Sequence, residues 1–233
     1  MRVVAESKRI VVTGAYGGIG GACFDLFAQR GHRVVGFDIQ ARDGVRPLDV
    51  TDEAAVDDAF TLIEGELGGL DVLVHAAGIT GQQLLEITDI PLDGWRRIID
   101  INLTGTFLVA RAATRLMVKQ GSGVQLLIGS GAGTTGPSGS IPYGASKGGV
   151  NGLVMTHAGH MAKHGIRVHN VMPGSVDTPL VRGSLAEREQ RGLPTDEVDA
   201  VRAACVSAAD VARGIALLAD DDAAFLRSNI ATR

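Results

Sequence analysis

Two ionisable residues, Tyr143 and Lys147, stand four positions apart in the segment Tyr-Gly-Ala-Ser-Lys. Residues four apart lie on one face of a helix, so the Lys147 ammonium can come near the Tyr143 hydroxyl. A free tyrosine has a pKa of about 10, which is too high for proton exchange at neutral pH. A neighbouring cation favours the phenolate and lowers that pKa. The pair therefore indicates a tyrosine general acid or base, although the spacing alone also fits an ordinary surface pair.

A glycine-rich segment follows the first apolar run of the chain and reads Thr-Gly-Ala-Tyr-Gly-Gly-Ile-Gly over residues 13–20. Gly14 allows a strand to turn sharply, Gly18 allows backbone amides to approach a pyrophosphate, and Gly20 allows the next helix to pack closely on the strand. The positive end of that helix would point at the phosphates. Any tight junction between a strand and a helix favours glycine, but its position at the first strand of an alternating pattern indicates a nucleotide site.

An acidic residue, Asp38, ends the second expected strand. A carboxylate there can accept hydrogen bonds from the adenosine ribose and repels a 2′-phosphate; the alternative is an ordinary aspartate at a strand end. Tyr16 and Ile39 stand where a basic residue would be expected for NADP, and Arg42 is the one base close in sequence. The sequence therefore predicts NAD as the cofactor.

Short β-branched runs alternate with longer helical patterns along the chain. Runs that are almost wholly apolar are buried on both faces, as a parallel sheet requires, and the alternation indicates right-handed crossovers in a doubly wound sheet. The expected strands are Arg9–Thr13, Arg33–Asp38, a weak one near Arg46–Leu48, Val72–His75, Val124–Ile128 and Arg167–Met172. The expected helices are Gly20–Arg30, Asp52–Leu67, Asp93–Lys119, Tyr143–His164 and Ala208–Leu218. No linker or repeat interrupts them, so we expect one Rossmann-like α/β domain over residues 1–233.

Composition narrows the classes of partner. The chain has 233 residues, is 45% hydrophobic and carries a net charge of −4 without a basic block, which argues against nucleic acid or an anionic membrane. Cys23 and Cys205 lack the spacing and neighbours of a metal site, so no metal is expected, and Cys23 is expected to be a buried structural thiol. The apolar run Ile10–Val12 is too short for a secretory signal, and no apolar stretch reaches the length of a membrane span. We expect a cytoplasmic protein.

The glycine spacing is T-G-x-x-x-G-x-G and not the G-x-G-x-x-G fingerprint. With the Tyr-x-x-x-Lys pair, and with Ser130 just past the fifth strand, it resembles the short-chain dehydrogenase/reductase family. The resemblance runs from Ile10 to about Leu218, with the motifs in family order. It implies an oxidoreductase that moves a hydride between a nicotinamide and a carbonyl or secondary alcohol.

The resemblance also implies a role for each catalytic candidate. Tyr143 would be the general acid in ketone reduction and the base in alcohol oxidation. Ser130 would hold the substrate oxygen. Lys147 would bind the nicotinamide ribose and, helped by the charge of an oxidised nicotinamide ring, lower the pKa of Tyr143. Asn102 matches a helix asparagine that positions a water for proton relay; the alternative is an asparagine bonded to a neighbouring carbonyl.

By the same resemblance, Asp49 and Val50 would contact the adenine, and the Pro-Gly segment after the sixth strand would hold the nicotinamide carboxamide through Val176 and Thr178. The expected cofactor-binding residues are Gly14, Tyr16, Gly18, Ile19, Gly20, Asp38, Asp49, Val50, Ala77, Gly78, Lys147, Pro173, Gly174, Val176 and Thr178.

Two places depart from the family pattern. The usual Asn-Asn-Ala-Gly after strand four reads His75-Ala-Ala-Gly78; Gly78 still lets the backbone lie against adenosine, and His75 is expected to be a hydrogen-bonded structural residue and not a base. The family's closing strand and Asp-Gly-Gly turn have no clear counterpart before Arg233, so the last strand is expected to be shortened or missing.

The charged segment 180–202 fits either a solvated surface helix or a mobile substrate lid over the carboxyl edge of the sheet.

The family resemblance implies a homodimer or homotetramer that pairs through the helices Asp93–Lys119 and Tyr143–His164. One apolar face would be supplied by Leu108, Val109, Ala112 and Ala113.

Two related enzyme classes are alternatives that the sequence disfavours. A sugar epimerase of the extended family would need a longer carboxyl-terminal substrate domain, and an enoyl reductase would have six residues between the tyrosine and the lysine instead of three. A catalytically silent NAD-binding regulator is the alternative from another class; the four catalytic candidates together argue against it.

Overall fold

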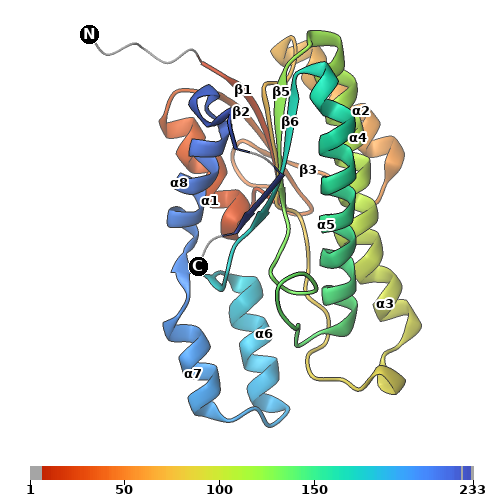
Figure 1. Ribbon diagram of the computed structural model, residues 1–233, viewed down its shortest axis with the longest axis vertical. Helices are drawn as coiled ribbons and strands as arrows, with labels where there is room; N and C mark the ends of the chain where they lie inside the picture. Colours follow the sequence, from red (N-terminus) through yellow and green to blue (C-terminus); the bar gives the residue numbers. More distant parts are fainter. Residues whose placement is uncertain (1–6, 227, 232–233) are drawn as a thin grey trace.

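The computed structural model describes residues 7–226 and 228–231, and its main sheet lies between two layers of helices (Figure 1). The strands of this sheet are β1 Arg9–Thr13, β2 Arg33–Asp38, β3 Val45–Pro47, β4 Val72–His75, β5 Gly123–Ile128, β6 Ile166–Met172 and β9 Ser228–Ala231. They run parallel in the order β3-β2-β1-β4-β5-β6-β9. The strand order reverses between β1 and β4, and ligands bind outside the carboxyl ends of the strands at such a switch point. The expected doubly wound α/β fold is confirmed.

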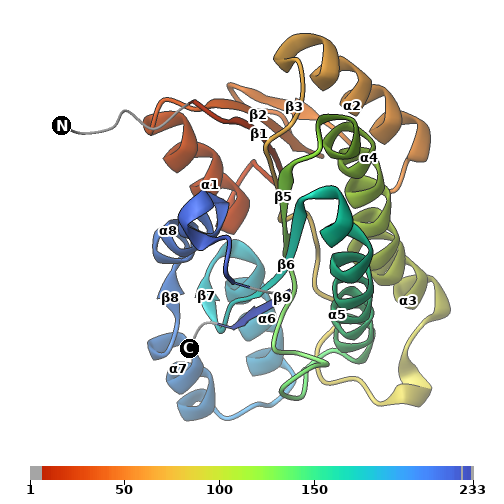
Figure 2. The ribbon, with the colours of Figure 1, turned by 45° about the horizontal axis from the view of Figure 1, so that its top comes forward.

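Alternate residues of the central strands feed two separate apolar cores. Val11 of β1 packs with residues of the helices α2 Glu53–Leu67 and α4 Gly105–Gln120, while Ile10 and Val12 pack with α1 Gly18–Gln29 and α8 Ala208–Ala219. Figure 2 shows α1 and α8 on one face of the sheet, and α2, α4 and α5 (Ile141–Met161) on the other. Because both faces are covered, β1 and β4 read as continuous apolar runs.

The helix expected over Asp93–Lys119 is interrupted. It consists of α3 Leu92–Ile99, the π-helical turn η2 Asp100–Thr104 and α4. In η2 the Gly105 amide donates to the Asp100 carbonyl, five residues earlier, so one extra residue enters the turn. A Cβ at Gly105 would lie 2.8 Å from Val50 Cγ2. The glycine therefore lets this widened turn approach the loop after β3.

The carboxyl-terminal strand is present. β9 pairs in parallel with β6, from His169–Ser228 to Met172–Ala231, so the expectation of a missing strand is wrong and that of a short one is correct. The segment 180–202 forms two helices, α6 Pro179–Gln190 and α7 Thr195–Ala203. They are framed by a small sheet of β7 Val176–Asp177 and β8 Val206–Ser207, whose two-residue strands are too short for a sequence pattern.

The four residues expected to form a subunit face lie inside the molecule. Leu108, Val109, Ala112 and Ala113 are at most 5% exposed and belong to the core beneath α4, because their side of the helix packs on the sheet. No helix within residues 7–226 and 228–231 combines the length and apolar character needed to cross a bilayer.

Candidate active site

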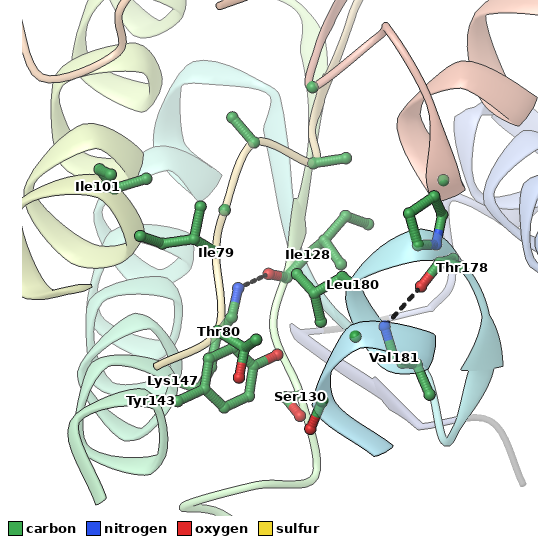
Figure 3. A pocket seen from close by; sticks show the side chains of 18 of the residues that line it. Ile79, Thr80, Ile101, Ile128, Ser130, Tyr143, Lys147, Thr178, Leu180 and Val181 are labelled. Carbon is green, nitrogen blue, oxygen red and sulfur yellow. Dashed lines mark hydrogen bonds between the residues drawn. The ribbon is translucent and has the colours of Figure 1, made fainter. Parts of the chain in front are cut away.

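A cavity of about 1470 Å³ opens at the carboxyl edge of the sheet, where the loops after β1, β2, β4, β5 and β6 meet (Figure 3). Its described lining includes every expected site residue except Gly20 and Asn102. The parallel topology explains this convergence, because the carboxyl ends of parallel strands share one edge.

The glycine turn forms one wall of the cavity. Gly14 has φ +70°, and a Cβ there would lie 2.6 Å from the backbone of Ala76 and Ala77; Gly18 has φ +58°. A Cβ at Gly20 would lie 2.2 Å from the Gly14 carbonyl oxygen, so Gly20 serves the close packing of helix on strand and does not line the cavity. No side chain of the described residues caps α1, whose N-cap is Gly17. Its first amides therefore stay available for an anion such as a pyrophosphate, so this wall fits a dinucleotide.

Asp38 is held against this turn. Its Oδ2 accepts a hydrogen bond from the Tyr16 amide at 3.0 Å, and its Oδ1 accepts one from the Gln40 amide at 3.2 Å. Arg42 is turned elsewhere: its guanidinium donates to the Ala15 carbonyl and to Asp25 and stacks on Phe24. The Asp38 carboxylate thus stands in the cavity wall with a fixed orientation and no ion pair within 4.0 Å in the described part of the chain.

Two further cofactor candidates already have hydrogen-bond partners within the protein. Asp49 Oδ1 accepts from the amide and the hydroxyl of Thr51. Thr178 caps α6, because its Oγ1 accepts from the Val181 amide and donates to the Val176 carbonyl, each at 3.3 Å. A Cβ at Gly18 would come within 3.5 Å of Thr178 Cγ2. The segment after β6 therefore lies directly beside the glycine turn.

Tyr143, Lys147 and Ser130 meet in the cavity between α5 and the end of β5 (Figure 3). The Lys147 ammonium donates to the Ile128 carbonyl at 2.8 Å and lies 5.7 Å from the centre of the Tyr143 ring. Burial lowers the pKa of Lys147 to about 8. Ser130 Oγ accepts from the Ala132 amide at 3.1 Å, which fixes the serine beside the tyrosine.

The lower pKa expected for Tyr143 requires an oxidised nicotinamide as well as Lys147, and for the cofactor-bound protein it stays a prediction. Burial raises the pKa of Tyr143, and a hydrogen bond with Ser130 opposes that shift only in part. Burial has this effect because a phenolate loses its hydration when it is removed from water. Lys147 also directs its ammonium to the Ile128 carbonyl and not to the phenol.

Asn102 lies behind the cavity wall, fully buried in the π-helical turn. Its Oδ1 accepts from the Ile79 amide, and its Nδ2 donates to the Ile79 carbonyl and to Ser146 Oγ, all at 2.9–3.0 Å. Both amide protons are therefore in use. The alternative interpretation, an asparagine bonded to a neighbouring carbonyl, describes this geometry, and it ties the loop after β4 to α5.

His75 and Cys23 have the structural character expected of them. His75 Nδ1 shares a 2.7 Å hydrogen bond with Thr13 Oγ1, and burial, with the charge of Lys147, lowers its pKa to about 3. A neutral imidazole with so low a pKa is a poor base at pH 7. Burial raises the pKa of the Cys23 thiol to about 12, so it stays protonated.

Sequence reasoning missed Gln83, and within the candidate lid 180–202 it did not single out which residues face the cavity. Gln83, Glu187 and Arg188 line the cavity together with the apolar residues Leu180 and Val181. No motif marks Gln83, which lies in a loop, and the two charged residues follow the pattern of a solvated helix. The carbonyl of Ile128 that binds Lys147 has no signal in a sequence at all.

Comparison with known proteins adds independent findings. The family model described as short chain dehydrogenase matches residues 8–189. The chain is 39% identical to a cis-4-hydroxycyclohexanecarboxylate dehydrogenase from Sinomonas cyclohexanicum and 34% identical to the 3-oxoacyl-acyl-carrier-protein reductase FabG from Escherichia coli (strain K12). In each case 95% of this chain and 93% of the relative are covered. The crystal structure of a single-residue variant of actinorhodin polyketide ketoreductase with NADPH superposes with a TM-score of 0.86 at 27% identity, covering 97% of this chain and 95% of that one.

The two sequence relatives are oxidoreductases by name, and the superposed ketoreductase has the same fold as this chain. In this chain the Tyr-x-x-x-Lys pair and Ser130 lie in one cavity beside the glycine turn. The chain belongs to the short-chain dehydrogenase family, as an oxidoreductase that transfers hydride between a nicotinamide cofactor and a carbonyl or alcohol.

Proposed function

We propose that this protein uses NAD(H) to interconvert a carbonyl and a secondary alcohol, with Tyr143 as the general acid and base. The observation that carries the proposal is the convergence of Tyr143, Ser130 and Lys147 on the cavity that the glycine turn and Asp38 also line. A bound nicotinamide would supply or accept the hydride. A catalytically silent regulator has no physical need for this convergence.

Ser130 and Tyr143 would act together on the substrate oxygen. The Ser130 hydroxyl is fixed by the Ala132 amide and would hold the oxygen by a hydrogen bond. Tyr143 would give its proton to that oxygen in reduction and remove it in oxidation. The raised pKa of Tyr143 keeps its hydroxyl protonated at neutral pH, which is the form that reduction requires. Lys147 would donate to the nicotinamide ribose and add a positive charge beside the tyrosine.

The choice of NAD over NADP rests on Asp38. Its carboxylate is oriented by two backbone amides at the edge of the turn, and Arg42 is occupied by Asp25 and Ala15. A 2′-phosphate would meet an uncompensated negative charge there. The superposed ketoreductase was solved with NADPH, so cofactor preference has to be measured for this chain itself.

The helices α6 and α7 would form the substrate lid over residues 180–202. They supply Leu180, Val181, Leu185 and Val201 to the cavity wall, and the paired strands β7 and β8 flank them. Closure of such a segment would shield the substrate from water. The exposed side chains of Phe107 on α4 and Met155 on α5 would form part of the contact in a homodimer or homotetramer. A cytoplasmic location stays a prediction.

The test is a screen of ketones and secondary alcohols with NADH or NAD⁺, followed by the absorbance of the reduced nicotinamide. The panel includes 4-oxocyclohexanecarboxylate and short 3-oxoacyl thioesters, which correspond to the names of the two relatives. Turnover that disappears in the variant Tyr143→Phe supports the proposal. Turnover that survives unchanged in Tyr143→Phe excludes the assigned chemistry.

A further inference from the structure

Three polar side chains around the cavity form a hydrogen-bonded group that the proposed mechanism does not use. Gln83 lies in the loop after β4, and Glu187 and Arg188 lie on α6. All three line the cavity. The Leu84 amide donates to the Gly139 carbonyl at 2.6 Å, so this loop is also joined to the segment just before α5. Three parts of the chain that are distant in sequence therefore meet at this point.

Gln83 is the buried centre of this group, with 1% of its surface exposed. Its Nε2 donates to Thr80 Oγ1 at 2.9 Å and to the Gly81 carbonyl at 2.6 Å. Its Oε1 accepts from Arg188 Nε at 2.9 Å. With both amide protons engaged, the side chain cannot rotate without losing hydrogen bonds. Gln83 is therefore a positioning residue that fixes the plane of the Arg188 guanidinium.

Arg188 keeps an unneutralised charge. Glu187, its neighbour on the helix, has its Oε1 3.0 Å from Arg191 Nε, and the same oxygen accepts a hydrogen bond from the Gln83 backbone N–H at 3.1 Å. No carboxylate of the described residues lies within 4.0 Å of Arg188, and its two terminal nitrogens have no hydrogen-bond partner among those residues. The absence of a side chain at Gly139 makes room for the Arg188 guanidinium, because a Cβ at Gly139 would lie only 2.6 Å from Arg188 Nη2.

The position of Arg188 assigns it to the substrate and not to the cofactor. Thr178, at the start of α6, lies beside the glycine turn. Arg188 stands near the other end of α6, about 15 Å along the axis at 1.5 Å per residue. Its guanidinium instead lies against Gly139, which directly precedes the N-cap of α5, and Tyr143 is in the first turn of that helix. The charge is therefore on the side of the cavity where the substrate would extend away from Tyr143.

We infer that Arg188 binds a carboxylate of the substrate, so that this protein acts on small oxo acids and hydroxy acids. A planar guanidinium with two free terminal nitrogens matches a carboxylate bidentately. The inference rests on the proposed function and specifies its substrate class. Arg96 and Arg97 also line the cavity, from α3, but both are exposed, so solvent and salt screen them.

The first test is binding without turnover. Cyclohexanecarboxylate and its neutral amide have the same ring and no reacting oxygen, and calorimetry measures their Kd for the protein saturated with NAD⁺. We expect the carboxylate to bind at least about tenfold more tightly than the amide, as a charge-assisted hydrogen-bonded pair does. Arg188→Gln should bring the two Kd values together. The control Arg182→Gln removes the same charge from the same helix at an exposed residue paired with Asp177, and the preference should persist.

The second test uses turnover and separates the two proposals. The ratio of kcat/KM for 4-oxocyclohexanecarboxylate to that for its amide should fall at least about tenfold in Arg188→Gln, mainly through KM, and stay as in the wild type in Arg182→Gln. Arg188→Lys keeps the charge without the planar fork and should fall between them. A wild-type protein that binds both probes equally, binds neither, or keeps its preference in Arg188→Gln overturns the inference. If the inference fails but the protein is active on neutral ketones, the proposed function still holds. If the protein binds carboxylates through Arg188 but turns over no substrate, the role of Arg188 holds and the proposed reaction is wrong.

Discussion

Replacing Asp38 by serine should relax the preference of this protein for NAD(H) over NADP(H). The carboxylate cannot turn away from a 2′-phosphate without losing the hydrogen bonds from the Tyr16 and Gln40 amides, at 3.0 and 3.2 Å. Two unit charges about 5 Å apart repel by about 3 kcal/mol at an effective dielectric near 20. Partial exposure and salt reduce this, and about 1.4 kcal/mol is enough for a tenfold preference.

The assay is kcat/KM for NAD⁺ and NADP⁺ with one alcohol substrate, at fixed ionic strength. In the wild type the ratio should favour NAD⁺ at least about tenfold, and Asp38→Ser should bring the ratio towards one, mainly by a lower KM for NADP⁺. Asp43→Ser is the matched control, because it removes the same charge from an exposed position in the same loop, outside the described cavity lining. The control should keep the wild-type ratio.

Arg42 provides a second check of the same argument. It is held by Asp25 at 2.9 Å, so Asp25→Ala should free a guanidinium near the ribose end of the site and improve NADP⁺ use in the presence of Asp38. Equal use of both cofactors by the wild type, or a preference for NADP⁺, would refute the reasoning. Asp38 would then be only the last residue of β2.

Four further predictions concern the remaining assignments. Tyr143→Phe should lower kcat by roughly 10²–10⁴-fold and leave the Kd of NADH measured by fluorescence nearly unchanged, because only an ionisable hydroxyl is lost; a kcat within a factor of a few of the wild type would contradict this. NADH affinity should fall as pH rises through about 8, where Lys147 loses its charge, and Lys147→Arg should be free of that decline. His75 has a pKa of about 3 when folded and 6.5 when unfolded, so the unfolded state binds the extra proton as pH falls through this window. Between pH 6.5 and pH 4 the wild type should therefore lose about 3 kcal/mol more of its free energy of unfolding than His75→Asn does, as measured by urea denaturation. Light scattering at micromolar concentration should give a dimer or tetramer, and Phe107→Asp should shift it to monomer; a wild-type monomer would exclude the assembly.

Most of the fold could be predicted because its signals are local. β1, β2 and β4 have the expected bounds, since nearly continuous apolar runs between turns favour buried parallel strands. The π-helical turn could not be predicted, because residues 100–104 follow the helical pattern and nothing in their spacing marks the extra residue of the turn. The burial of the apolar face of α4 could not be predicted either, because periodicity identifies an apolar face but not what covers it. β9 lacked a signal because four residues suffice once β6 provides the pairing partner.

The candidate site could likewise be predicted only in part, where its residues belong to local motifs. Residues within motifs, such as Gly14 and Tyr143, could be found because spacing along one element determines where they lie. Contacts between elements could not: the buried Gln83 meets Arg188 from another part of the chain, and nothing near either residue in the sequence signals the other. The sequence identifies Asn102 as a candidate but not its hydrogen-bond partners. These are the backbone of Ile79 and the hydroxyl of Ser146, which lie in other parts of the chain.

The pKa shifts of the central pair have a common physical cause. Burial opposes charge on both side chains, so it raises the pKa of Tyr143 and lowers that of Lys147. In the protein alone the tyrosine is consequently a neutral acid that can donate its proton without prior ionisation. The opposite step, proton removal from an alcohol, needs the phenolate, which becomes accessible only when further positive charge enters the cavity or the pH rises. Spacing along a helix can bring a lysine to a tyrosine, but the balance between its charge and the cost of burial depends on the whole cavity around them.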